Sequence, residues 1–309
     1  MKKLYKSNIY FLLILIGSII IPYGLRYIYF FLGVRDTKVM LLGNHIIIFF
    51  IPAIIYLIVT KSNFKETLRL NKLHLKDIGI VILIAIVSWP LMMCVSAIGS
   101  MFTKNNLAEY VTSISSTPYI IMVLLFGVMP AITEEINLRG IVLSGYDGQT
   151  KFKAAIMTGI LFGIFHLDLH QFLYATALGF LMAYVVRVTN SIFSSMLIHF
   201  IVNTLSTTMQ KVNFTYNSSN INDAKSIDPT SISLDYKFAV IQVAVFLGIC
   251  FAGLVYKLIK VLERLNDERI SEWKVDMSRD VASVEKEKII NIPFIAIIIV
   301  YIIAMIFIR

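Results

Sequence analysis

Long apolar runs separated by short polar segments are the feature that most constrains what this chain folds into. A helix that crosses a bilayer needs about 20 mostly apolar residues, because its backbone polar groups must bond within the segment. The runs are 8–32, 39–60, 77–99, 118–145, 152–168, 171–188, 190–209, 237–260 and 289–308. The fifth and sixth runs are short and nearly continuous. We therefore expect an all-α, polytopic membrane helix bundle with about eight or nine transmembrane helices.

The composition excludes a soluble enzyme and a disordered chain. Hydrophobic residues make up 58% of the sequence and charged residues only 15%, whereas soluble domains have roughly 45–50% and about 25%. Too few charges are present to cover the surface of a soluble fold, and disordered chains are poor in apolar residues. The two cysteines lie inside apolar runs, so they indicate neither a disulfide framework nor a CxxC site.

The positive charge indicates membrane orientation rather than nucleic-acid binding. The net charge is +9. If the N-terminus is cytoplasmic and the helices alternate in direction, most Lys and Arg residues fall on the cytoplasmic side, as the positive-inside rule requires. The abundance of Ile, Lys and Asn suggests an AT-rich bacterial genome. We expect a multi-pass protein of a bacterial cell membrane with a cytoplasmic N-terminus and no nucleic-acid partner.

The chain divides into three predicted regions. Residues 1–117 form N-terminal transmembrane helices and include a basic amphipathic segment, 61–77, expected to lie on the anionic cytoplasmic leaflet. Residues 118–209 span the fourth to seventh helices. Residues 210–309 combine an external polar loop, a transmembrane helix, a charged cytoplasmic loop at 261–288 and a C-terminal transmembrane helix.

The fourth apolar run contains three ionisable residues within six positions: Glu134, Glu135 and Arg139. Each costs roughly 2.5–3.5 kcal/mol at the membrane centre on insertion scales, so such residues are functional candidates. Glu135 and Arg139 are four apart and share a helix face. Glu134 is rotated by about 100° from Glu135 and remains free to face another helix. The alternative is a buried ion-pair cluster that only locks the bundle.

Two later runs add further polar residues at helical spacing. Phe162 and His166 are four apart in the fifth run, and His199 and Asn203 are four apart in the seventh. A rise of about 1.5 Å per residue places these groups in one layer with Glu134, displaced towards the cytoplasm. We therefore predict a shared polar pocket nearer the cytoplasmic side, opened in part by a kink at Pro130.

The ordered motifs EExxxR (Glu134, Glu135, Arg139), FxxxH (Phe162, His166) and HxxxN (His199, Asn203) resemble those of one family. It is the CPBP or Abi family of intramembrane proteases, which includes the type II CAAX prenyl proteases. The resemblance covers about residues 118–209 and implies a catalytic core formed by the fourth to seventh helices.

The resemblance also assigns roles to these residues. It implies that Glu134 is the general base that activates water, assisted by His166. Glu135 pairs with Arg139 and supports the site together with Phe162, while His199 and Asn203 stabilise the oxyanion. An apolar pocket and side-chain donors suit this chemistry. The implied activity is an intramembrane glutamic endopeptidase.

A zinc site is the alternative chemistry, with Glu134, His166 and His199 as three ligands and an open position for water. The sequence lacks HExxH, and no His stands beside the glutamates. We therefore expect glutamate catalysis without a cofactor, with a Zn²⁺ metalloprotease as the alternative.

Three functions remain open at this point. The first is a protease acting on a membrane-embedded or lipid-modified protein or peptide within the bilayer, including peptide or bacteriocin maturation and immunity. The second is a non-catalytic bacteriocin-immunity or membrane-binding protein. The third is a transporter or proton relay, which would be expected to show inverted repeats and broken helices. The sequence shows no such repeats.

Overall fold

The computed structural model describes residues 2–217, 232–281 and 287–307, and these residues form helices and connecting loops without a β-strand. The helical segments are α1 (Lys3–Phe31), α2 (Thr37–His45), η1 (Ile46–Phe50), α3 (Ile51–Val59), α4 (Phe64–Thr67), α5 (Leu75–Ser100), α6 (Asn106–Ser113), α7 (Tyr119–Met122), η2 (Val123–Val128), α8 (Met129–Glu135), η3 (Ile136–Val142), α9 (Leu143–Gly145), α10 (Lys151–Phe165), α11 (Leu169–Thr189), α12 (Ile192–Asn217), α13 (Leu234–Val281) and α14 (Ile292–Phe307). The segments named η are π-helical turns.

The predicted all-α polytopic membrane bundle is confirmed. Each predicted apolar run corresponds to a helix or to a continuous series of helical segments, such as α7 through α9. Within the described residues, seven of these are long and apolar enough to cross a membrane. The other two, α10 and α14, have 15 and 16 residues. The exact number of crossings therefore stays a prediction.

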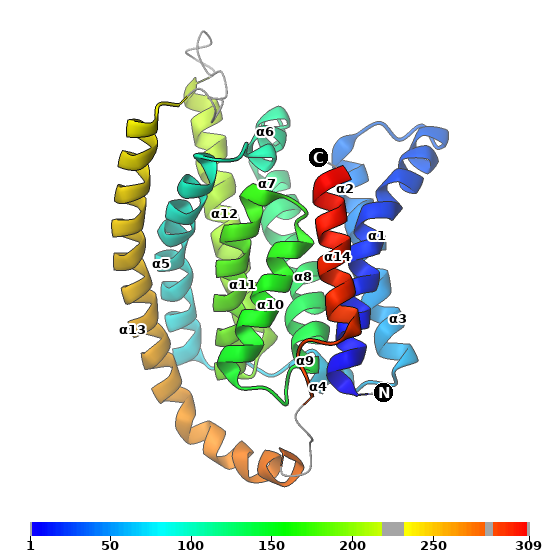
Figure 1. Ribbon diagram of the computed structural model, residues 1–309, viewed down its shortest axis with the longest axis vertical. Helices are drawn as coiled ribbons and strands as arrows, with labels where there is room; N and C mark the ends of the chain where they lie inside the picture. Colours follow the sequence, from blue (N-terminus) through cyan, green and yellow to red (C-terminus); the bar gives the residue numbers. More distant parts are fainter. Residues whose placement is uncertain (1, 218–231, 282–286, 308–309) are drawn as a thin grey trace.

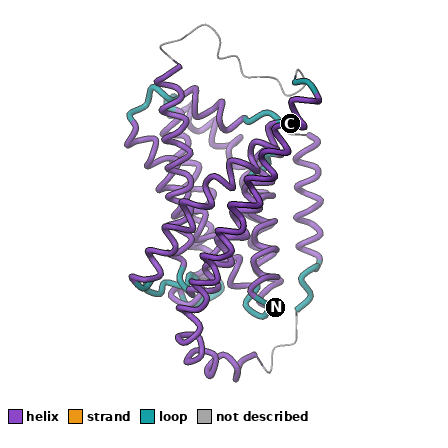
Figure 2. The backbone as a smooth tube through the Cα atoms, turned by 90° about the vertical axis from the view of Figure 1, so that its left-hand side faces the viewer, coloured by secondary structure: helices purple, strands orange, loops and turns teal. Residues whose placement is uncertain are grey.

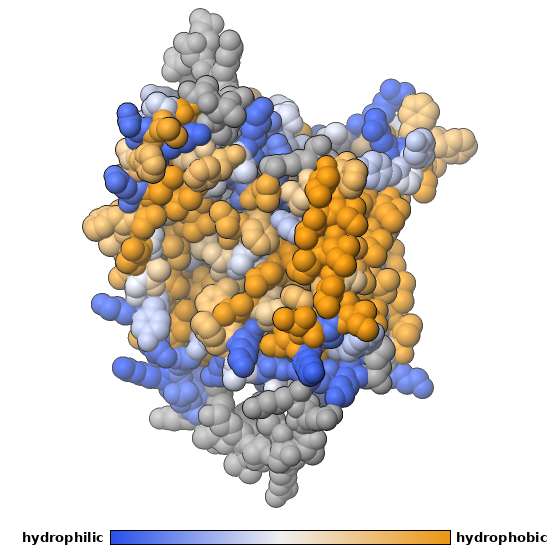
Figure 3. Space-filling view, viewed as in Figure 1, coloured by the Kyte–Doolittle hydropathy of each residue, from blue (hydrophilic) through white to orange (hydrophobic). Residues whose placement is uncertain are grey.

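The helices run up and down the long axis of the molecule, with the two termini at opposite ends (Figures 1 and 2). We call these ends the N-terminal end and the α6 end, after the elements that lie there. Helix α13 packs against α5, and α14 packs against α1. On the face shown in Figure 3, a broad apolar band crosses the middle and hydrophilic residues lie towards both ends, which is the surface expected of a chain embedded in lipid.

Small residues bring α10 and α11 into close contact. A Cβ atom added to Gly159 would lie 2.7 Å from the backbone nitrogen of Phe180, and one on Gly163 would lie 2.7 Å from the Phe172 carbonyl oxygen. Lipid supplies little hydrophobic driving force, so membrane helices associate through such close backbone packing. The contact fixes the position of His166, which follows the last residue of α10.

The basic segment 61–77 is only partly the membrane-surface stretch that we expected. Its lysines at 61, 65, 72 and 76 are exposed, but α4 is a single helical turn, and Leu68 and Arg69 are buried. Arg69 adopts a left-handed backbone (φ 49°), and its carbonyl accepts a hydrogen bond from the backbone of Ile192. The centre of the segment is therefore part of the protein core beneath η3.

An ionic cluster closes the N-terminal end of the bundle. Asp147 forms ion pairs with Lys3, Arg69 and Arg187, at 3.0 Å for Lys3 and 3.6 Å for Arg187. Burial acts to raise the pKa of Asp147, but the charges of Arg69, Lys3 and Arg187 outweigh burial and hold this pKa below its ordinary value. These contacts join four segments that are far apart in the sequence.

The polar loop and charged loop of the third region fall partly outside the described residues. Of the predicted external loop 210–236, positions 218–231 are not described, and α12 and α13 extend into the rest of it. Of the charged loop at 261–288, positions 282–286 are not described, and the preceding part continues α13 as a helix. The division of the chain into three regions stays a prediction.

Candidate active site

The two adjacent glutamates have different environments. Glu135 and Arg139 are fully buried, and the Arg139 guanidinium donates a hydrogen bond to Glu135 Oε1 at 2.8 Å. Arg139 also donates to the Gly179 carbonyl at 3.2 Å. The Glu134 side chain is 13% exposed and lines the pocket described below. The predicted division of the pair is thus observed: Glu135 is held by Arg139, and Glu134 faces the pocket.

His199 lies between the two glutamates. Its Nδ1 is 2.8 Å from Glu135 Oε1, and its Nε2 is 3.9 Å from Glu134 Oε2. A carboxylate paired with an arginine accepts hydrogen bonds and does not donate them, so Nδ1 of His199 carries the hydrogen. In the neutral imidazole, Nε2 is then an acceptor that faces Glu134. A water molecule beside the two side chains would be within hydrogen-bonding reach of both groups.

Phe162 separates the two histidines of the motifs. Its ring makes edge contacts with His166 at 4.7 Å and with His199 at 5.8 Å between ring centroids. The Arg139 guanidinium lies over the same ring, 4.4 Å from its centroid. His166 Nδ1 is 2.8 Å from the Phe162 carbonyl oxygen, so this nitrogen is the donor and Nε2 is the available atom of the neutral ring.

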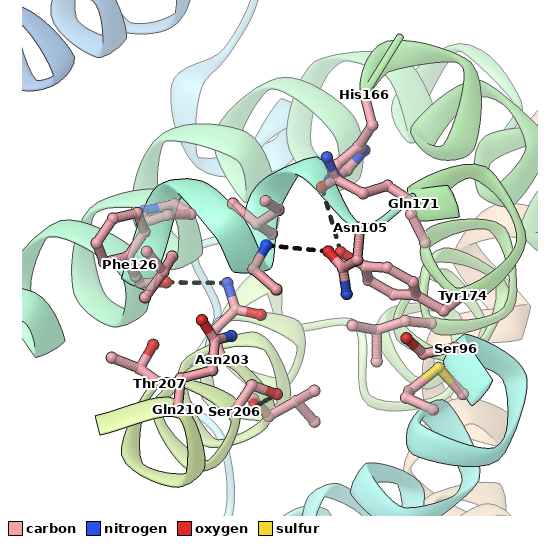
Figure 4. Close-up of a pocket in the computed structure, with 18 of the residues that line it drawn as sticks. Ser96, Asn105, Phe126, His166, Gln171, Tyr174, Asn203, Ser206, Thr207 and Gln210 are labelled. Atoms are coloured by element: carbon pink, nitrogen blue, oxygen red, sulfur yellow. Dashed lines mark hydrogen bonds between the residues drawn. The ribbon is translucent and has the colours of Figure 1, made fainter. Parts of the chain in front are cut away.

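Asn203 lines the cavity and is hydrogen-bonded to the π-helical turn η2 of the fourth run. Its amide nitrogen donates to the Phe126 carbonyl at 3.0 Å (Figure 4). Pro130 stands four residues after Phe126 and has no N–H, so it cannot form the usual helical hydrogen bond to that carbonyl. The irregularity expected near Pro130 is present as the π-helical turn η2, which precedes α8.

These side chains surround a cavity of about 550 Å³, within the range of small-molecule sites. Five residues predicted from the motifs line it: Glu134, Phe162, His166, His199 and Asn203. Its polar lining also includes Gln171 and Tyr174, which are hydrogen-bonded to each other (Figure 4). Glu135 and Arg139 do not line the cavity and support it from behind.

The cavity extends towards the α6 end of the bundle, and the expected displacement towards the cytoplasm stays a prediction. Its lining includes Asn105 and Tyr110 at the α6 end of the bundle and Gln210 near the end of α12. Counting from helix ends places Glu134 near mid-depth, but it does not reveal which side the cavity faces. The packing of side chains decides which side the cavity faces, because buried residues fill the space between Glu135 and the N-terminal end. Leu138, Ile141 and Val142 are fully buried there.

His45 lines the cavity, although no role could be assigned to it from the sequence. It lies at the end of α2, and its Nδ1 is 3.2 Å from the Thr133 hydroxyl. The Thr133 hydroxyl donates to the Met129 carbonyl, so it accepts from His45. The only signal in the sequence was an ionisable residue within an apolar run.

Asn137 is a second residue that the motifs did not single out. Its amide donates to the carbonyls of Phe49 and Thr133, at 3.1 and 2.6 Å, and its side-chain oxygen accepts from the Tyr10 hydroxyl. These bonds tie the π-helical turn η3, directly after the two glutamates, to α1 and η1. A buried amide satisfied in this way fixes the rotation of the helix that carries Glu134.

The side chains do not converge as a metal centre. In the part of the chain that the structure describes, no three His, Cys, Asp or Glu side chains are grouped closely enough to hold a metal ion. Catalysis without a cofactor, and the alternative of Glu134, His166 and His199 as zinc ligands, both stay predictions. Nδ1 of His166 is bonded to a backbone carbonyl, which leaves Nε2 as the atom of this ring that faces the cavity.

Comparison with known proteins identifies the segment that carries these residues. Residues 116–205 match the family model described as Type II CAAX prenyl endopeptidase Rce1-like. The resemblance to the CPBP family is confirmed. The chain is also 28% identical over 176 residues to a protein of Bacillus subtilis (strain 168) with the name "Putative membrane peptidase YdiL". That alignment covers 53% of this chain and 70% of YdiL. No solved structure matches.

The family match and the similarity to YdiL support a coarse function. The chain is a CAAX-protease-like membrane peptidase, and its multi-pass helix bundle agrees with this. The matched segment contains every motif residue from Glu134 to Asn203. The other helices lie outside the family match, although α1, α2 and α5 contribute contacts or lining residues to the matched segment and its cavity.

Proposed function

We propose that this chain hydrolyses a peptide bond of a membrane-associated protein or peptide with water activated by Glu134. The observation that carries the proposal is the asymmetry of the glutamate pair. Glu135 is neutralised by Arg139 and orients His199, while Glu134 faces the cavity 3.9 Å from His199 Nε2. A carboxylate beside an imidazole in a cavity is an arrangement suited to general-base catalysis.

In the proposed reaction, Glu134 takes a proton from water, and the water oxygen bonds to the carbonyl carbon of the substrate. The carbonyl π electrons move to oxygen and form a tetrahedral oxyanion. The intermediate then collapses, the C–N bond breaks, and protonated Glu134 gives its proton to the leaving amine. His166 assists by presenting its free Nε2 to the same cavity, where it can hold the attacking water.

The oxyanion requires donors that are already in place. Asn203 uses one amide hydrogen for the Phe126 carbonyl, and this bond leaves its second amide hydrogen for the substrate. His199 faces the same space with Nε2, and this atom is a donor when both ring nitrogens carry a hydrogen. Each donor is worth about 2.7–4 kcal/mol in comparable enzymes.

The substrate class follows from the lining of the cavity. Trp89, Met92, Met93 and Leu178 contribute apolar surface near the polar residues. Such a lining suits a peptide with apolar side chains or a lipid modification, including a peptide of the bacteriocin type. A prenylated CAAX substrate belongs to the same chemical class.

The deciding experiment compares protein and peptide termini in cells that produce the wild-type chain or Glu134→Gln at matched levels. Glu66→Gln is the control, because Glu66 lies on exposed α4, away from the cavity. Termini present with the wild type and with Glu66→Gln, but lost with Glu134→Gln, are expected. Unchanged termini together with a preserved immunity phenotype would contradict hydrolysis and favour the non-catalytic binding function.

The absence of a metal requirement is a separate part of the proposal. Purified active protein is expected to keep its activity after dialysis against a chelator and to contain less than stoichiometric metal. Activity that is lost on chelation and restored by Zn²⁺ alone would overturn metal-free catalysis. Glu134 is expected to be essential both in metal-free and in zinc-dependent catalysis.

A further inference from the structure

We propose that the active-site cavity receives its substrate from the non-cytoplasmic side of the membrane, so that the peptide bond cut belongs to an exported peptide or an external segment of a membrane protein. This inference rests on the proposed hydrolysis. Three features of the molecule support it: the direction of the cavity, the closed packing beneath it and the distribution of charge.

The cavity lies in the half of the bundle nearer the α6 end. It is lined by the second half of α5, from Trp89 to Ser100, and by α6 together with the preceding Asn105. Helix α12 contributes residues from His199 to Gln210. Both α5 and α12 run towards the α6 end (Figure 1). Glu134 and His199 therefore form the deepest part of a cavity that continues towards that end.

The opposite direction is closed. Below Glu134 lies the buried Glu135–Arg139 pair, and the Arg139 carbonyl accepts a hydrogen bond from Arg69. Arg69 in turn pairs with Asp147 in the ionic cluster of the N-terminal end. The cavity lining contains no residue from this ionic cluster or from α4. A peptide arriving from the N-terminal end would have to break these buried contacts.

The charge distribution assigns the N-terminal end to the cytoplasm. The exposed lysines of the connection from α3 to α5 lie at this end, at positions 61, 65, 72 and 76. Lys153 near the start of α10 is also exposed, and Lys260 on α13 pairs with Glu263, whose carboxylate is within electrostatic reach of Lys151 at the start of α10. Among the described residues, the connections at the α6 end have fewer basic residues, namely Arg35 between α1 and α2 and Lys104 between α5 and α6. The positive-inside rule then places α6 outside the cytoplasm.

Labelling of single cysteines tests the sidedness directly. The background is Cys94→Ala with Cys250→Ala, which removes both native thiols. Glu109→Cys reports the α6 end and Lys65→Cys the N-terminal end, since both side chains are exposed. Ala108→Cys reports the cavity lining.

Intact cells are treated with a membrane-impermeant maleimide, and the labelling is repeated after the cells are opened. We expect Glu109→Cys and Ala108→Cys to react in intact cells and Lys65→Cys to react only in opened cells. Reaction of Lys65→Cys alone in intact cells would overturn the inference. Thermal unfolding of each variant in detergent verifies that the fold is retained.

The positions of the cleaved bonds provide the second test. Termini that depend on Glu134 are expected in exported peptides or in external segments of membrane proteins, and termini in cytoplasmic segments would overturn the inference. Labelling requires no proteolysis. If wild-type cells yield no new termini, the proposed hydrolysis fails while the labelling pattern still decides the sidedness.

Discussion

The Asn203 amide donates a hydrogen bond to the Phe126 carbonyl at 3.0 Å, and the two residues are 77 positions apart in the sequence. Pro130 cannot supply the usual helical N–H to this carbonyl. One residue of the HxxxN motif therefore holds together the helix that carries Glu134 and keeps a second amide hydrogen for the cavity. The structural and the proposed chemical roles of Asn203 are linked through this bond.

This relationship predicts a coupling between Asn203 and Pro130. Asn203→Ala should lower the free energy of unfolding by about 0.5–1.5 kcal/mol, the usual net value of one hydrogen bond. In the Pro130→Ala background an N–H becomes available to the Phe126 carbonyl, so Asn203→Ala should cost less stability. The proteolytic activity of Asn203→Ala should stay low both with Pro130 and with Pro130→Ala, because the donor to the substrate is missing in each case. Thermal unfolding of the four proteins measures the coupling, and strictly additive losses would contradict it.

The buried Glu135–Arg139 pair predicts a large asymmetric effect on stability. Glu135→Gln or Arg139→Met alone leaves an uncompensated buried charge and should destabilise the fold by about 3–5 kcal/mol. The double variant removes both charges and should recover part of that loss. Unfolding in detergent gives the three values. A double variant as unstable as the sum of the single ones would show that the pair acts independently of its charges.

The close packing of α10 on α11 predicts a position-specific cost for an added methyl group. Gly163→Ala should destabilise by about 1–3 kcal/mol, because its Cβ would overlap the backbone of Phe172. Gly253→Ala on α13 is the matched control, since a Cβ there meets no atom within 4 Å. Equal unfolding temperatures for the two variants would contradict the packing argument.

Asp147 predicts a pH dependence of stability with a defined sign. The pKa of Asp147 in the folded protein lies below the ordinary value of 3.8. The ionised carboxylate therefore adds its full contribution to the free energy of unfolding above pH 3.8, and this contribution is lost as the pH falls through the folded pKa. Asp147→Asn should therefore lower the unfolding temperature at pH 7, and the difference from wild type should narrow below pH 3.8. The effect should be modest, because the carboxylate is 41% exposed. A difference in unfolding temperature between wild type and Asp147→Asn that widens as the pH falls would contradict the lowered pKa of Asp147.

His45 predicts a positioning effect on Glu134 through Thr133. His45→Phe keeps the ring shape and removes the bond to the Thr133 hydroxyl, so kcat should fall by up to about tenfold, the equivalent of one hydrogen bond. Thr133→Val removes the same bond from the other side. If His45 acts through Thr133, the double variant should be no slower than the slower single variant. If the fold-decrease in kcat of the double variant equals the product of the decreases of the two single variants, His45 contacts the substrate itself.

Much of the site could be predicted from helical spacing. Glu135 and Arg139 are four residues apart, and that interval alone places them on one face, as the structure has them. The motif residues Glu134, Phe162, His166, His199 and Asn203 do meet in one cavity. His45 and Asn137 were missed, because their contacts come from helices far away in the sequence and leave no periodic signal.

The sequence by itself determined that the chain spans the membrane many times as helices. Apolar length and the cost of unsatisfied backbone groups in lipid leave no other arrangement. It also determined which polar residues share a helix face, since that depends only on 3.6 residues per turn. Only the tertiary structure decided which other groups hold the Glu135–Arg139 pair and that Glu134 faces a cavity, because His199 and Gly179 come from other helices. The direction of the cavity depends on packing for the same reason: the buried contacts that close one end lie between segments remote in the chain.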